Sequence, residues 1–181
     1  MKRIILIFTV CFYSHNSVSQ IPIANTYLSL DEALQNPLNV YKLFLYNTNL
    51  TKLPESFGNL TNLQELTITN TLLTELPESI GKLTNLKKAN LSDNKISYLP
   101  KSIGSLTNLE ELDLSKNQLI TLPQTIGNLE NLTSLDLWNN KITVLPESIF
   151  NLNNLVKLTL GYNQLTTLSS FIFFLGFGIY N

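Results

Sequence analysis

The sequence predicts a repeat solenoid of the α/β type, with short parallel strands on one side and short 3₁₀ or irregular segments on the other. Three observations predict this fold class. A 23-residue period runs through most of the chain, most copies contain an alternating Leu-x-Leu core, and most then carry a Leu-Pro pair. One copy is too small to bury its own leucines, so the stacked array is the folding unit.

The repeat stays in register through six copies, without an insertion or deletion. Its template reads L-x-x-L-x-L-x-x-N-x-L-x-x-L-P-x-x-I-G-x-L-x-N, and residues 109–131 show it fully. The copies open at Val40, Leu63, Leu86, Leu109, Leu132 and Leu155. Chance does not keep such a pattern in phase through six copies, so we assign residues 40–178 to six repeats, the last of them atypical.

Residue types predict the local structure within each copy. Leu112 and Leu114 face the core while Asp113 faces solvent, which is the alternation of a short strand. Pro123 forbids a continuing strand, and the short arc after it suits a 3₁₀ turn better than a full helix. Each arc of the first four copies contains a glycine, which we expect either to take a positive φ or to allow close packing: Gly58, Gly81, Gly104 and Gly127.

A column of asparagines follows the strands and predicts a hydrogen-bonded ladder inside the stack. An Asn amide offers two donors and an acceptor, so it can satisfy the backbone groups of a turn. The ladder consists of Asn94, Asn117, Asn140 and Asn163. The first two copies carry Thr48 and Thr71 at this position, where fewer hydrogen bonds are available, and we expect those coils to be looser.

These residues resemble the leucine-rich-repeat family, in its 23-residue form with the L-P-x-x-I-G-x-L second half. The resemblance covers residues 40 to about 175 and is similar to the repeats of bacterial extracellular proteins and of Ras-pathway scaffolds. It implies a horseshoe with a parallel sheet on its concave face and short 3₁₀ or irregular segments on the convex side. It also implies a role in protein–protein recognition, without naming a ligand.

The N-terminus reads as a secretory signal peptide over residues 1–19. Lys2 and Arg3 precede an apolar run, and a small-x-small site ends at Ser19, after which we expect cleavage. The mature protein would then be secreted or lie in the cell envelope. The alternative is an uncleaved N-terminal segment that anchors the protein in a membrane, although the apolar run is shorter than the ~20 residues that a span needs.

Residues 20–39 form a predicted N-terminal capping segment. Ser29 and Glu32 have the spacing of a capping box, which predicts a short helix through Gln35 that stops before Pro37. The last copy differs from the others, because Phe171, Phe174 and Phe177 occupy positions that are polar elsewhere. This aromatic tail is an alternative surface for self-association, membrane contact or a structural role in the envelope.

Composition argues against catalysis and against several classes of ligand. The only Cys, His and Arg of the chain (Cys11, His15 and Arg3) lie within the predicted signal peptide, so the mature chain lacks thiol, imidazole and guanidinium groups. We find no Gly-rich phosphate loop and no metal-ligand cluster, and predict no cofactor, no metal and no small-molecule substrate. A mildly acidic chain without arginine is also a poor candidate for binding nucleic acid.

Candidate binding residues lie in columns along the predicted concave face. Asp113 and Asp136 occupy equivalent positions on neighbouring strands, and Trp138 is placed beside Tyr162. We predict that these four side chains contact a protein partner, since exposed aromatics often carry most of the binding energy. The alternatives are that Trp138 only packs across strands, that the acids are solvated, or that the two acids belong to a carboxylate hydrolase.

Overall fold

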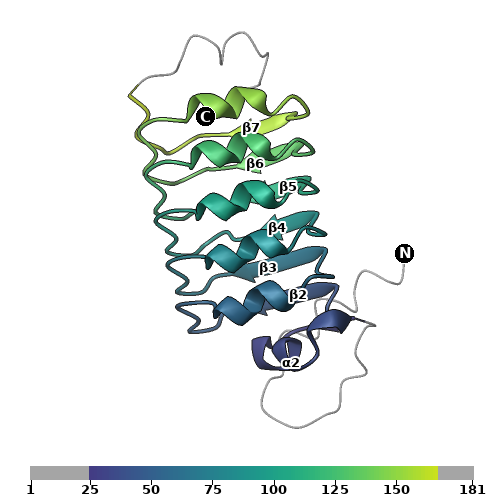
Figure 1. The fold of residues 1–181 in the computed structure, drawn as a ribbon. Coiled ribbons are helices and arrows are strands. Elements are labelled where there is room, and N and C mark those ends of the chain that lie inside the picture. The colour runs from purple at the N-terminus through teal and green to yellow at the C-terminus, as the bar shows by residue number, and fades with distance from the viewer. Residues whose placement is uncertain (1–24, 167–181) are drawn as a thin grey trace, which may run out of the picture.

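The computed structural model describes residues 25–166, which form one stacked array with an all-parallel, seven-stranded sheet. The strands pair in sequence order, so each coil contacts the coils before and after it (Figure 1). They are β1 (Thr26–Tyr27), β2 (Lys42–Tyr46), β3 (Glu65–Thr69), β4 (Lys88–Asn90), β5 (Glu111–Asp113), β6 (Ser134–Asp136) and β7 (Lys157–Thr159). In the described residues no helix has the length and apolar character needed to cross a membrane.

A second layer of short 3₁₀ helices lies opposite the sheet, as the sequence predicts. Each begins directly after a proline; Pro123, for example, has extended backbone angles (φ −68°, ψ 150°) that end the preceding segment. The layer contains η3 (Glu55–Asn59), η4 (Glu78–Lys82), η5 (Lys101–Ser105), η6 (Gln124–Asn128) and η7 (Glu147–Asn151). The predicted fold class, a repeat solenoid with a parallel sheet and short outer 3₁₀ turns, is therefore confirmed.

The core runs as a continuous column between the two layers. In the coil that opens at Leu109, the side chains of Leu112, Leu114, Leu122 and Ile126 are all at least 97% buried. Equivalent side chains of the neighbouring coils belong to the same buried cluster. The hydrophobic contribution therefore comes from stacking of coils, because a coil on its own would leave this ring in water.

The four glycines allow close packing of neighbouring 3₁₀ helices, and the positive φ that we offered as their alternative role is wrong. None of them has a positive φ. A Cβ atom added to Gly104 would lie 2.3 Å from the backbone oxygen of Thr125, and one added to Gly127 would lie 2.3 Å from that of Ser148. A side chain at these positions would force the coils apart, since real Cβ contacts are longer.

Positive φ values occur instead at the residue just before the ladder position of each coil. Their φ angles lie between 52° and 57°, within the left-handed region. The column comprises Asn47, Asn70, Asp93, Lys116, Asn139 and Tyr162. The left-handed residue turns the chain away from its strand, which the sequence analysis assigned to the ladder asparagine alone.

The ladder asparagines each connect two successive coils by hydrogen bonds. The side-chain oxygen of Asn117 accepts a hydrogen bond from the backbone N–H of Ile96 at 2.9 Å. Its amide nitrogen donates to the backbone oxygens of Leu91, at 2.9 Å, and Leu114, at 3.1 Å. Asn140 and Asn163 make equivalent bonds. The amide nitrogen of Asn94 also makes equivalent bonds, whereas its side-chain oxygen accepts from Thr71.

The two threonines of this column differ from one another. Thr71 is 94% buried, and its hydroxyl donates to the side-chain oxygen of Asn94, so Thr71 extends the ladder by one coil toward the N-terminus. Thr48 is exposed. The expected looseness of these coils therefore has a structural basis in the first coil, and it stays a prediction.

The N-terminal end of the stack is covered by α2 (Leu30–Gln35) and η2 (Pro37–Asn39), as Figure 1 shows. Ser29 caps α2 by accepting the backbone N–H of Glu32 at 3.4 Å, which is one of the two hydrogen bonds of the predicted capping box. Ala33 is completely buried against the first coil. The sequence analysis missed β1, which adds a short parallel strand to the edge of the sheet beside β2.

Candidate functional site: the strand face

The exposed side of the sheet, here called the strand face, corresponds to the concave face predicted from the sequence. Its side chains come from alternate strand positions, because the other side chains of each strand enter the core. Across β3 to β7 it is hollowed into a shallow groove of about 330 Å³. The polar side chains that line this groove include Glu65, Lys88, Asn90, Glu111, Asp113, Ser134, Asp136 and Lys157.

Asp113 and Asp136 lie directly opposite one another on β5 and β6 and line the groove together. Each uses one carboxylate oxygen, Oδ1, to accept a backbone N–H two residues later: Ser115 at 2.9 Å for Asp113, and Trp138 at 3.0 Å for Asp136. Among the described residues neither carboxylate has an ion-pair partner. The groove therefore contains two neighbouring negative charges that no lysine of this part of the chain neutralises.

Charges in the N-terminal half of the strand face are paired across neighbouring strands. Lys42 contacts Glu65 at 2.7 Å, and Lys88 contacts Glu111 at 2.6 Å. The hydrogen bond that Lys88 donates to Glu111, together with the charge of Glu111, raises the pKa of Lys88 above its usual value. These pairs are exposed and are worth only ~0.2–1 kcal/mol each, so they mainly support register and solubility.

Trp138 and Tyr162 form an aromatic pair at the C-terminal end of the strand face. Their ring centroids are 5.2 Å apart, and the ring planes meet at 67° in an edge-to-face arrangement. Trp138 is partly buried, whereas Tyr162 is 73% exposed. The structure thus brings the two predicted aromatics together and places Trp138 two residues after Asp136, the last residue of β6.

Tyr162 combines high exposure with a backbone conformation that bulky residues rarely adopt. Its φ is 55°, and the equivalent residues of three other coils are asparagines, which tolerate this region better. A large exposed aromatic held in the left-handed region is an outlier, and such outliers gather at functional sites. In this conformation the ring of Tyr162 contacts that of Trp138 and is largely exposed.

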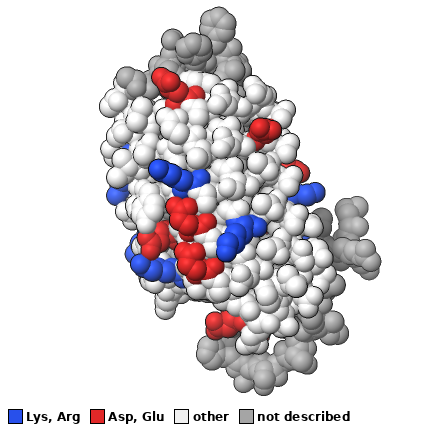
Figure 2. Space-filling view, viewed as in Figure 1, with Lys and Arg blue, Asp and Glu red and all other residues white. Residues whose placement is uncertain are grey.

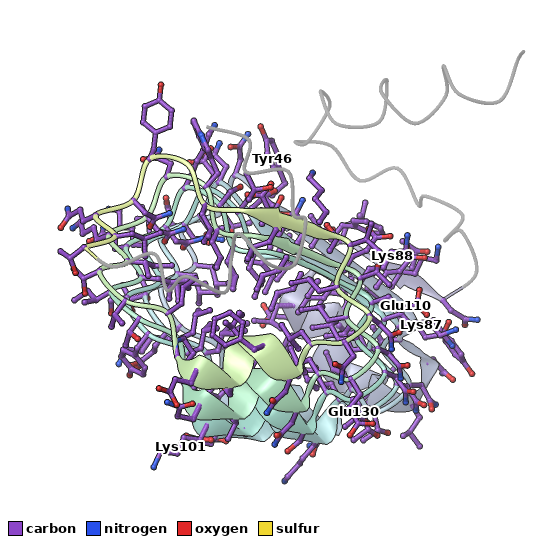
Figure 3. The ribbon with its side chains drawn as sticks, turned by 90° about the horizontal axis from the view of Figure 1, so that it is seen from above. Tyr46, Lys87, Lys88, Lys101, Glu110 and Glu130 are labelled. Carbon is purple, nitrogen blue, oxygen red and sulfur yellow. The ribbon has the colours of Figure 1, made fainter. Side chains whose placement is uncertain are left out.

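A second aromatic group lies near the N-terminal end of the same face. Phe44 is partly buried and Tyr46 is 57% exposed on β2. The helix α2 leaves Tyr46 in solvent, and in Figure 3 its side chain points outward, away from the 3₁₀ helices near Lys101 and Glu130. Two aromatic groups therefore flank the groove, one at each end.

The opposite face uses its charges to support the stack. Figure 2, which views this face, shows acidic and basic side chains gathered over the N-terminal coils, while the C-terminal coils are mostly uncharged. Glu55 accepts the backbone N–H of Ser79, and Glu78 that of Ser102, both at 3.2 Å. These carboxylates satisfy the free N–H groups at the start of the next 3₁₀ helix, which is a structural task.

A three-residue cluster on the flank of the stack links successive coils. Glu75 accepts hydrogen bonds from Lys52, at 2.8 Å, and from the hydroxyl of Tyr98. Its pKa is lowered, first by the hydrogen bond from Lys52 and then by that from Tyr98, while the pKa values of Lys52 and Tyr98 are raised by the same contacts. The three residues occupy one position of successive repeats and satisfy one another.

The sequence analysis missed a second asparagine column, although its period was visible in the template. Each of these asparagines donates to a backbone oxygen of the preceding coil at 2.7–2.8 Å: Asn62, Asn85, Asn108, Asn131 and Asn154. The described residues contain no group of three or more Asp, Glu, His or Cys side chains that could hold a metal ion. The predicted signal peptide and the aromatic tail residues Phe171, Phe174 and Phe177 lie outside the described residues.

Comparison with known families supports the assignment made from the repeat. Residues 32–118 match the leucine-rich repeat region family, residues 108–129 match a single leucine-rich repeat, and residues 130–174 match a further leucine-rich-repeat family. No curated protein matches the sequence significantly.

Among solved structures, the chain is similar to a leucine-rich-repeat protein of Leptospira interrogans, with 37% identity and a TM-score of 0.67 over 83% of this chain and 44% of that one. It is also similar to the ectodomain of the receptor kinase GASSHO1/SCHENGEN3 from Arabidopsis thaliana, solved in complex with CASPARIAN STRIP INTEGRITY FACTOR 2 (30% identity, TM-score 0.68, 77% of this chain and 17% of that one).

A third structure, the ectodomain of the receptor kinase SOBIR1 from Arabidopsis thaliana, is 32% identical with a TM-score of 0.62, over 70% of this chain and 72% of that one. The chain spans less than half of the Leptospira protein and less than a fifth of GASSHO1/SCHENGEN3. The 23-residue repeat, the parallel sheet with its 3₁₀ layer and these matches together show that the chain belongs to the leucine-rich-repeat family.

Proposed function

We propose that the protein is an exported, non-enzymatic binding module that holds a protein partner on its strand face. The observation that carries this proposal is the edge-to-face pair of Trp138 and Tyr162 beside the groove of Asp113 and Asp136. The leucine-rich-repeat fold is commonly a protein-binding module. An aromatic centre with polar neighbours is the usual arrangement of an interaction hot spot.

The dimensions of the strand face suit a protein partner better than a small substrate. The groove is shallow, open and lined by side chains of several strands, whereas small-molecule sites are enclosed and mostly apolar. A hydrolase that used Asp113 and Asp136 is less well supported, because both carboxylates bind their own backbone through Oδ1. If the biological activity of the protein is unchanged after both aspartates are replaced, the hydrolase alternative is excluded.

Site-specific photo-crosslinking tests which face binds. A photoreactive amino acid is placed at Trp138 and, in a matched control, at Lys101, which lies on the side of the 3₁₀ helices in Figure 3. We expect adducts with one extracellular or envelope protein from position 138 and none from position 101. With that protein in hand, Trp138→Ala should weaken binding by at least about 2 kcal/mol without altering the circular dichroism spectrum. Normal binding by this variant would contradict the proposal.

The alternative function is a structural or scaffold role that uses the aromatic tail. It is favoured by the sequence alone, through Phe171, Phe174 and Phe177. Removal of residues 171–181 would abolish crosslinking in that case and leave it intact if the strand face binds.

Export is tested by N-terminal sequencing of the secreted protein. We expect the secreted chain to begin at Gln20, and a chain that begins at Met1 would contradict cleavage.

A further inference from the structure

The two aspartates of the groove form an unbalanced charge pair that the fold does not need. Asp113 and Asp136 are in direct register on strands that lie ~4.8 Å apart, and like charges directly opposite one another destabilise a sheet. Glu65 and Glu111 on the same face each have a lysine within 2.7 Å. Lys157 also lines the groove, yet forms no ion pair within the described residues.

The neighbouring coil shows that the structural task of this position requires no charge. Asn90 occupies the equivalent position on β4, and its side-chain oxygen accepts the backbone N–H of Ser92 at 3.0 Å. Asp113 and Asp136 do the same with Oδ1, at 2.9 and 3.0 Å. Their second oxygens, Oδ2, accept no hydrogen bond from the described part of the chain, so two acceptors are available to a ligand.

A planar cation matches this arrangement. The forked N–H groups of a guanidinium can bridge two carboxylate oxygens on adjacent strands, and charge-assisted bonds of this kind are among the strongest in proteins. Trp138 follows Asp136 on the same segment and is partly exposed, so its ring can lie beside the cation. A lysine ammonium can also approach two carboxylates, but it lacks the planar fork that stacks on an aromatic ring.

We propose that the groove binds an arginine side chain of an extended protein segment, held between Asp113 and Asp136 and against Trp138. This inference rests on the proposed function, since it assigns the chemistry of the partner that the strand face would hold. The argument for arginine is charge complementarity. Among the described residues, Asp113 and Asp136 are the only two adjacent carboxylates lining the groove that have no ion-pair partner, and they lie near the aromatic pair of Trp138 and Tyr162.

The test is selection of linear twelve-residue peptides from a random phage-displayed library, using the folded wild-type protein. The selected peptides are then measured against Trp138→Ala, against the double variant Asp113→Asn with Asp136→Asn, and against Glu130→Gln with Glu147→Gln. The last pair of glutamates is exposed and lies off the strand face, so this control removes the same charge elsewhere. Asparagine keeps the backbone hydrogen bond, as Asn90 shows, so the double variant folds.

We expect selected peptides to be enriched in arginine, and to bind the double aspartate variant about tenfold more weakly, while the glutamate control binds normally. Replacing the enriched arginine by citrulline, which is neutral, should cause a similar loss. Peptides that need Trp138 but show no arginine enrichment, or that bind the double aspartate variant normally, would overturn this inference and leave the proposed function standing. Peptides that all bind Trp138→Ala normally would overturn both.

Discussion

Two adjacent residues in each coil turn the chain out of its strand, and they contribute in different ways. Asn117 fills the interior of the turn with hydrogen bonds, while Lys116 before it takes a φ of 52°. The sequence predicted the first role because asparagine recurs with the period. It did not predict the second, because residues as different as Lys116 and Tyr162 occupy that column, so residue type carries no signal there.

The left-handed column offers a direct test on Lys116. Lys116→Asn should stabilise the protein by up to about 1 kcal/mol, because asparagine enters this backbone region at lower cost, as Asn139 does in the next coil. Urea denaturation at neutral pH measures the change. Lys87→Asn is the matched control, since Lys87 is also exposed but does not have a positive φ. Equal shifts in the two variants would show that charge, and not backbone strain, is responsible.

The asparagine ladder predicts a contrast between the interior and the first coil. Asn117→Ala should lower the free energy of unfolding by ~1–3 kcal/mol, because it leaves the buried backbone N–H of Ile96 without an acceptor and removes the amide's hydrogen bonds to Leu91 and Leu114. Thr48→Ala should cost little, because Thr48 is exposed at the same repeat position. Thermal melts of the two variants measure the difference, and equal shifts would contradict the ladder argument.

At the scale of elements, the sequence predicted that the outer segments are 3₁₀ turns, but it did not predict how neighbouring 3₁₀ helices contact one another. The Leu-Pro pair and the short spacing identify a 3₁₀ turn, and the structure has one in each of five coils. The reason for glycine, however, lies in the next coil: Thr125 and Ser148 lie where a side chain on Gly104 or Gly127 would be. A single sequence cannot reveal a contact across a 21-residue separation until the stacking distance is known.

Close packing of the 3₁₀ helices makes a strong prediction for Gly104. Gly104→Ala places a Cβ 2.3 Å from the backbone oxygen of Thr125, so the coils must separate, and we expect a loss of ~1–3 kcal/mol or more. The control Ser105→Ala changes an exposed neighbour in the same helix and should be nearly neutral. Denaturant unfolding checks both variants, and a neutral Gly104→Ala would mean that the arcs are not in firm contact.

The cluster of Lys52, Glu75 and Tyr98 predicts how stability depends on pH. Hydrogen bonds from Lys52 and Tyr98 lower the pKa of Glu75 below its ordinary value of 4.5. A lowered carboxyl pKa stabilises the fold above the unfolded value, and this contribution is lost as pH falls through the folded-state pKa. Glu75→Gln should therefore reduce the drop in melting temperature between about pH 5.5 and about pH 3.5, one unit either side of the ordinary value, whereas the exposed control Glu147→Gln should not. An unchanged acid transition in Glu75→Gln would show that these contacts do not persist in solution.

At the scale of the whole molecule, the repeat predicted the architecture and the placement of the four candidate side chains. It placed Asp113 beside Asp136 and Trp138 beside Tyr162 because a fixed period converts sequence position into a column on the sheet. It could not show that both carboxylates lack an ion-pair partner, since that depends on side-chain reach. It also missed β1, whose two residues fall outside the period.

The stack also predicts where the molecule is most rigid, and hydrogen exchange can measure this. Coils of a solenoid contact only their neighbours, so protection should follow the local density of connections. The ladder begins with Thr71 and Asn94 and continues through Asn163, while Thr48 contributes no interior amide. Amides in the middle of the ladder should therefore exchange more slowly than those of the first coil. The backbone N–H of Leu114, for example, donates to Asp136 at 2.8 Å, whereas that of Asn47 donates to Thr69 at 3.3 Å.

Asp113, Asp136 and Trp138 lie on these ladder-linked coils, so the proposed site would be organised before a partner arrives, which lowers the entropy cost of binding. Uniform protection along the array would mean that it opens only as a whole, and the site would then gain no rigidity from its position.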